Sequence, residues 1–139
     1  MNALTAGAEA LRTQGDDCAV VALLEAGLTA DPGNADGWFL LARIHRDNDN
    51  SLASLAALER LIAMRPDDAG LAYLRARVRL DAGFDAVDAF AGAIALDREA
   101  TLPRLGLAAA LVAAGAADQA ESLLVHELKN DPAWIDGQV

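Results

Sequence analysis

The sequence predicts an all-α protein built from four consecutive helix-turn-helix units, and two observations carry that prediction. The first is a repeated phrase that ends in Pro32, Pro66 and Pro132, with Arg98 where a further proline would fall, in steps of 34, 32 and 34 residues. A period of about 34 residues is typical of a two-helix solenoid unit, which buries its apolar face by stacking on its neighbours. The second is the composition, 54% hydrophobic but only 4% aromatic, which favours helices packed at close range over a β-sandwich or barrel.

Apolar residues at helical spacing place two helices in each unit. In the first unit one stripe consists of Leu4, Ala8 and Leu11, and the next of Val20, Leu24 and Leu28. Gly15 and Asp16 mark the turn between these helices, and Asp31 with Pro32 ends the pair. The same pattern along the chain predicts eight helices, near residues 2–14, 17–30, 35–47, 51–64, 69–82, 85–97, 101–114 and 117–130.

The repeated residues carry a family resemblance. Unit one supplies Leu4, Ala8, Leu11, Gly15, Leu24, Gly27 and Pro32, unit two Trp38, Leu41, Ala42, Leu58 and Pro66, and unit four Leu107, Ala108, Leu111, Gly115, Ala120, Leu124 and Pro132. On these residues the chain resembles a bacterial-type tetratricopeptide repeat (TPR) array of about four degenerate units, approximately 1–34, 35–68, 69–100 and 101–134. The resemblance implies one TPR-like domain over residues 1–139, folded as a right-handed α-solenoid with a concave groove that binds protein segments.

Unit three departs from the pattern because it is two residues short. Ala86, Phe90 and Ile94 define its second helix. For its first helix we predict the register of Leu71, Leu74 and Val78, which puts one missing residue before that helix and one in the Gly83-Phe84 turn. A register one residue later would put Arg75 in a buried slot.

Charge and composition limit the partners. A net charge of −10 argues against nucleic acid and anionic membrane surfaces as partners. The longest apolar stretch, Leu105 to Ala117, falls short of the roughly 20 residues of a spanning helix. No secretory signal is visible at the N-terminus, and the single cysteine, Cys18, fits a reducing compartment, so we expect a cytoplasmic protein.

The last residues leave two interpretations open. Trp134 and Ile135 either fold back as a lid over the last helix, or the chain is an excised N-terminal part of a longer protein.

No motif predicts catalysis, a cofactor or a metal. His45-Arg46-Asp47 resembles a fragment of a kinase catalytic loop, but the other kinase motifs are missing. Asp47, Asp49 and Ser51 have the spacing of the first calcium-loop ligands, but Leu52 and Leu58 stand where that loop needs glycine and glutamate. We therefore expect no enzyme.

The candidate site is the concave groove that the resemblance implies. The family's ligand-contacting positions on the first helices correspond to Arg12, Phe39, Arg43, Arg46 and Arg79, and they become apolar in unit four with Leu105 and Val112. Arginine suits capture of carboxylates. The sequence thus predicts a protein-interaction module for an acidic peptide or partner segment.

The sequence also allows other roles for the arginines and for the domain. The arginines could instead pair with Glu9 and Asp47 on a solvated face. The domain could also be a non-catalytic docking or dimerisation appendage of a larger enzyme, or a scaffold that forms homo-oligomers.

Overall fold

The computed structural model describes residues 2–130 and contains only helices as regular structure within that range. The elements are α1 (Ala3–Arg12), α2 (Asp17–Ala30), α3 (Ala35–Asp47), α4 (Ser51–Met64), α5 (Ala69–Asp81), α6 (Val87–Leu96), α7 (Thr101–Ala113) and α8 (Ala117–Asn130). The predicted all-α class and the eight helices are confirmed. The largest differences are two residues, at the end of α1, which stops at Arg12 instead of residue 14, and at the start of α6, which begins at Val87 instead of residue 85.

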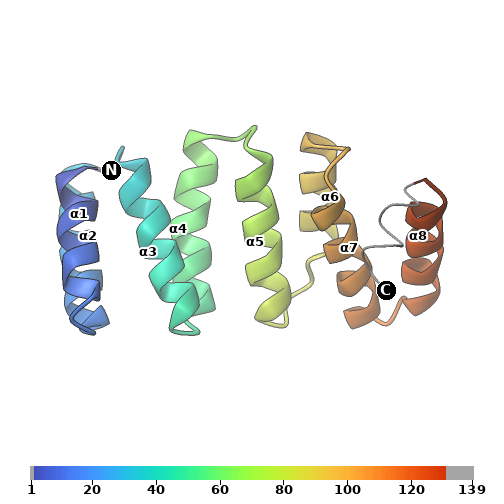
Figure 1. Ribbon diagram of the computed structural model, residues 1–139, viewed down its shortest axis with the longest axis horizontal. Helices are drawn as coiled ribbons and strands as arrows, with labels where there is room; N and C mark the ends of the chain where they lie inside the picture. Colours follow the sequence, from blue (N-terminus) through green and yellow to red (C-terminus); the bar gives the residue numbers. More distant parts are fainter. Residues whose placement is uncertain (1, 131–139) are drawn as a thin grey trace.

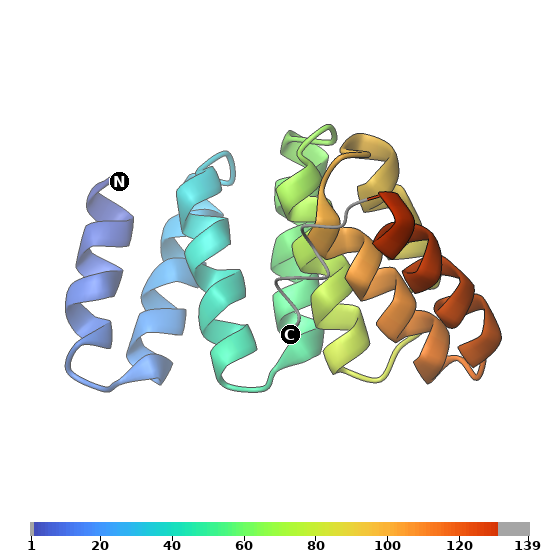
Figure 2. The same ribbon diagram turned by 45° about the vertical axis from the view of Figure 1, so that its right-hand side comes forward.

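The helices stand side by side in a row of pairs (Figure 1). Each first helix (α1, α3, α5, α7) packs on its own second helix (α2, α4, α6, α8), and each second helix packs on the first helix of the next unit. The turned view in Figure 2 keeps the first helices together along one side. We call the side that they form the groove face.

The hydrophobic core follows the row as a chain of clusters. The first contains Leu24 and Ile44, the second Leu58 and Leu61, and the third Phe90, and residues such as Trp38 pack against two of them. The core therefore lies mainly between units, as stacking requires.

Most helices begin with a polar cap. Asn2 and Thr5 form a reciprocal capping box at α1, and the side chains of Asp16, Asn34, Asn50 and Asp68 accept a backbone N–H at the next four helix starts. These bonds satisfy donors that an isolated helix leaves unpaired.

Each unit turns between its two helices through one residue of positive φ. These residues are Gly15, Asp49, Gly83 and Gly115, with φ of 79°, 59°, 83° and 83°. Their spacings of 34, 34 and 32 residues fix the repeat register independently of side-chain type.

The first helix of unit three lies one residue later than the sequence predicts. The Phe84 N–H donates to the Arg79 carbonyl at 2.9 Å, just as the Asn50 N–H donates to the His45 carbonyl at 2.8 Å. Arg79 is therefore the counterpart of His45, and Leu80 is the counterpart of Arg46.

Both missing residues fall between Gly83 and Ala86, so α6 has 10 residues where α2 and α4 have 14. The predicted register was wrong because it rested on the assumption that Arg75 cannot occupy a buried position. Arg75 occupies that slot, 29% exposed at its side chain, by pairing with Glu59 at 3.2 Å.

The predicted close contacts within units are buried. Ala86 and Ala120 are each 2% exposed, and Val20, in the matching slot of unit one, is fully buried. Ser54 fills the slot in unit two, where its hydroxyl donates to the Ala42 carbonyl at 2.8 Å. The predicted lid of Trp134 lies outside the described residues.

Ala120→Leu should destabilise the fold by about 1–3 kcal/mol, because the added carbons must enter a packed helix contact. The measurement is urea unfolding, with Ala117→Leu, at an exposed position of the same helix, as control. Equal stabilities of the two variants would contradict the assigned register.

Gly106→Ala should also destabilise, since a Cβ there would lie 2.1 Å from Cε1 of the fully buried Phe90. Gly92→Ala is the matched control: Gly92 has nothing within 4 Å of the added carbon, so we expect a gain of about 0.4–1 kcal/mol. A thermal melt that moves both variants in one direction would argue against the close α6–α7 contact.

Candidate functional site

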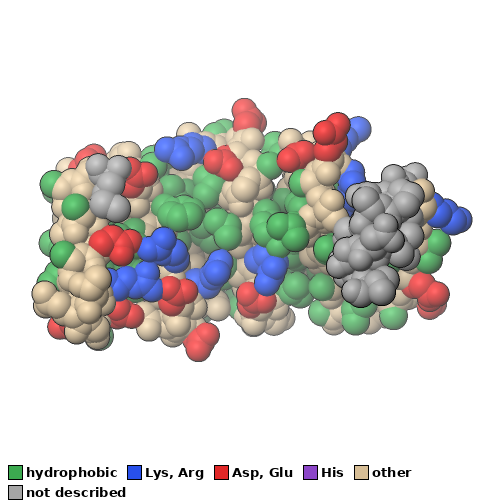
Figure 3. Space-filling view, viewed as in Figure 1, with side chains coloured by type: hydrophobic (Ala, Val, Ile, Leu, Met, Phe, Trp, Pro, Cys, Tyr) green, Lys and Arg blue, Asp and Glu red, His purple; other side chains and the backbone are tan. Residues whose placement is uncertain are grey.

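The layer of first helices is basic although the protein as a whole is acidic. The first helices α1, α3, α5 and α7 together carry seven arginines and four acidic residues, whereas the rest of the chain carries four basic and 17 acidic residues. Figure 3 shows basic side chains in a row across α1, α3 and α5, with hydrophobic side chains beside them. The two layers of the solenoid thus carry opposite net charge.

The corrected register defines which residues line this face in each unit. One position holds Thr5, Phe39, Tyr73 and Leu105, the next Glu9, Arg43, Arg77 and Ala109, and the third Arg12, Arg46, Leu80 and Val112. The face therefore changes from charged in units one and two to apolar in unit four.

A cavity of about 80 Å³, the groove cavity, opens on this face between α3, α4 and α5. Its walls are Ala42, Leu58, Leu74 and Val78, and Phe39, Arg43, Arg46 and Ser54 complete its lining. The cavity exists because α3 and α5 make few direct contacts, whereas α1 packs on α3 and α5 packs on α7.

Two groove arginines are already paired with acidic neighbours. Arg43 donates to Glu9 at 2.8 Å, and Arg12 pairs with Asp47, so that α1 and α3 are linked twice across the face. For these two residues the interpretation as a solvated ion-paired face is correct.

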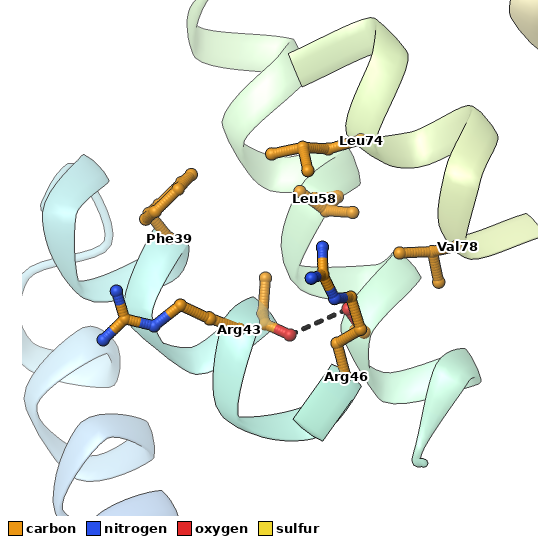
Figure 4. A pocket seen from close by; sticks show the side chains of 8 residues that line it. Phe39, Arg43, Arg46, Leu58, Leu74 and Val78 are labelled. Carbon is orange, nitrogen blue, oxygen red and sulfur yellow. Dashed lines mark hydrogen bonds between the residues drawn. The ribbon is translucent and has the colours of Figure 1, made fainter. Parts of the chain in front are cut away.

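Arg46 differs from both. Its side chain makes no hydrogen bond or ion pair with any residue that the structure describes. In Figure 4 it extends across the cavity towards Leu58, whereas Arg43 points away from the cavity. The dashed line there is the bond from Ser54 to the Ala42 carbonyl, which satisfies the polar group of the cavity wall. Arg46 thus offers an unpaired guanidinium beside an apolar hollow.

Tyr73 and Arg77 occupy the positions of Phe39 and Arg43 one unit further on, but they contact each other. Arg77 Nη1 donates to the Tyr73 hydroxyl at 3.0 Å and its guanidinium carbon lies 5.9 Å from the ring centroid. The hydrogen bond to Tyr73 raises the pKa of Arg77. Arg77 is therefore a positioned, permanently charged group on the groove face.

The remaining predicted residues do not meet at the cavity. Arg79 lines a separate hollow with Glu59, its Nε donates to the Asp85 carbonyl at 3.1 Å, and its guanidinium stacks on Phe84. Leu105 and Val112 lie on α7, and Val112 is 57% exposed. The predicted ladder of three arginines is thus reduced to Arg12 and Arg46.

The sequence interpretation missed Tyr73, Arg77 and the apolar walls Leu58, Leu74 and Val78. A signal for the first two was present: Phe39-Leu-Leu-Ala-Arg43 recurs 34 residues later as Tyr73-Leu-Arg-Ala-Arg77. Aligning these two phrases would have given the correct register.

Residues 2–130 show neither a cluster of metal ligands nor a membrane-spanning helix. No three His, Cys, Asp or Glu side chains gather in that range as they would around a metal ion. None of its helices combines the length and apolar character needed to span a membrane.

Comparison with known proteins identifies the fold. No protein-family model matches the chain. The rat PEX5-related protein is 33% identical over 55 residues, which are 40% of this chain and only 9% of that protein.

Solved structures match over nearly the whole chain. The crystal structure of MamA protein aligns with a TM-score of 0.79 and 18% identity, over 98% of this chain and 75% of the MamA chain. A tetratricopeptide repeat protein from Parabacteroides merdae aligns with a TM-score of 0.77 and 18% identity, over 93% of this chain and 51% of its own. With its four stacked helix pairs, the chain has the fold of a tetratricopeptide-repeat-type array.

Proposed function

We propose that this protein is an interaction module without catalysis of its own, which binds an acidic segment of a partner protein along the groove face. The TPR-type fold supports protein interaction as the general class of function. The observation that carries the specific proposal is Arg46, an unpaired guanidinium at the edge of an apolar cavity.

Arg46 is the natural anchor because a ligand carboxylate would not have to displace an internal partner. Arg43 is held by Glu9 and Arg12 by Asp47, so each would have to exchange one carboxylate for another. A guanidinium accepts a carboxylate through two parallel hydrogen bonds, and such charge-assisted bonds are about twice as strong as neutral ones.

The cavity beside Arg46 favours an aliphatic side chain next to the acidic residue of the ligand. Its volume of about 80 Å³ gives room for a few carbon atoms. Leu58, Leu74 and Val78 would contact those carbons, and Phe39, 42% exposed, would cover them from the side of α3.

The acidic body of the protein limits what reaches this face. Outside the first helices acidic residues outnumber basic ones by 17 to four, so an anionic ligand is repelled there, whereas the first helices together carry seven arginines and four acidic residues. Binding should therefore depend on ionic strength, since the Debye length falls from about 10 Å at 0.1 M to about 3 Å at 1 M.

The test is selection of a peptide from a random displayed library, followed by titration calorimetry of the selected peptide. We expect acidic residues beside aliphatic ones in the selected sequences. Arg46→Ala should weaken binding by about 1.5–3 kcal/mol, the contribution of a hydrogen bond to a charged group. Arg43→Ala should cost less, because Arg43 is already paired with Glu9.

Arg98→Ala is the matched control, since it removes the same charge from the exposed connection between α6 and α7. Binding that resists both Arg46→Ala and 1 M salt would contradict an acidic ligand. It would move the site to the apolar residues of α7 around Leu105 and Val112.

A further inference from the structure

A second hollow lies away from the groove face, between α2 and α4, with α3 as its floor. It has a volume of about 590 Å³, and we call it the outer trough. Glu25 of α2 stands on one wall and Arg60 of α4 on the other, above Leu41 and His45 of α3. None of its lining residues lines the groove cavity.

The next unit contains a corresponding hollow, in which the carboxylate already has an internal cation. The hollow between α4 and α6, over α5, has about 350 Å³ and has Glu59 where the outer trough has Glu25. In the corrected register its floor has Arg75 where the outer trough has Leu41, and Arg79 in place of His45. Arg75 Nη1 lies 3.2 and 3.4 Å from the two carboxylate oxygens of Glu59.

The outer trough thus has Glu25 as the counterpart of Glu59, but it has no counterpart of Arg75 to pair with it. The Glu25 side chain has no hydrogen bond or ion pair with any residue in the described range 2–130. Leu41, only 5% exposed, replaces the arginine with an apolar surface. A long side chain from outside could lie over Leu41 and reach Glu25 with its charged end.

The far end of the trough is held in a fixed shape. Trp38 Nε1 donates to the Pro32 carbonyl at 2.8 Å, and the Arg60 guanidinium carbon lies 5.5 Å from the Trp38 ring centroid. Arg60 is therefore engaged with the indole, and Glu25 stays available to a ligand.

We propose that the outer trough is a second docking site, which takes an arginine side chain from a basic segment of a partner protein. The guanidinium meets Glu25 as that of Arg75 meets Glu59, and its aliphatic stem covers Leu41 and Ala57. Charge complementarity favours a basic partner, because Glu25 is the acidic residue of the lining and has no internal cation among the described residues, while Arg60 is engaged with Trp38. The site is independent of the proposed groove ligand.

The test is an NMR titration of the full-length chain with N-acetyl-arginine amide, and with N-acetyl-citrulline amide as its neutral counterpart. The arginine probe should shift the Trp38 indole N–H and the backbone amides around Glu25 and His45, with a Kd on the order of 10 mM. The citrulline probe should leave these signals in place. Glu25→Gln should weaken the binding of the arginine probe about fivefold.

Glu59→Gln is the matched control, because Glu59 already has an internal cation, and Arg46→Ala should have no effect on this site. Equal shifts with both probes, or shifts that survive Glu25→Gln, would overturn the proposal. Dimerisation in sedimentation that Glu25→Gln abolishes would also overturn it, by assigning the trough to a second copy of the chain.

Discussion

The rest of the structure depends on one constraint: the first helix of each unit must approach its second helix closely. A buried alanine recurs at one position of every first helix, as Ala8, Ala42, Ala76 and Ala108, none more than 4% exposed. Because a helix has 3.6 residues per turn, fixing that alanine in the contact also fixes the face that points outwards. The residues one and four places later, Arg43 and Arg46 in unit two, then fall on the groove face. The packing position thus determines which residues lie on the groove face.

The sequence predicts the helices well and the site only in part. Apolar stripes and turn residues such as Gly15, Asp16 and Pro32 mark the helix boundaries, which is why most of them agree. The predicted register of unit three is wrong because a charged side chain does not have to be exposed: Arg75 is partly buried through its pair with Glu59. The pairing of Arg43 with Glu9 spans 34 residues and depends on the distance between helices. The groove cavity likewise depends on how far α3 and α5 stand apart, a sum of many contacts that no short motif encodes.

Because the units repeat, equivalent positions of neighbouring units can be compared within this one chain. A position that is ion-paired in one unit and unpaired in the next identifies a group that is free to bind. Arg46 and Glu25 are such groups, with opposite charge and in separate hollows, one on the groove face and one between second helices. The two proposed ligands, an acidic one on the first layer and a basic one on the second, rest on the same segregation of charge between the two layers. A module of this kind could join two different partners.

The central claim is that the groove face between units two and three holds an acidic segment anchored by Arg46. The most direct measurement places a photoreactive benzophenone side chain at position 39 in the source cells and maps the crosslinked segment by mass spectrometry. Position 52 is the control, since Leu52 is 69% exposed and lines neither the groove cavity nor the outer trough. We expect the probe at position 39 to crosslink to a segment that contains acidic residues. The probe at position 52 should not crosslink to this segment, and the Arg46→Ala substitution should abolish the crosslink at position 39. A crosslinked segment without acidic residues, or one that persists in the Arg46→Ala protein, would contradict the central claim.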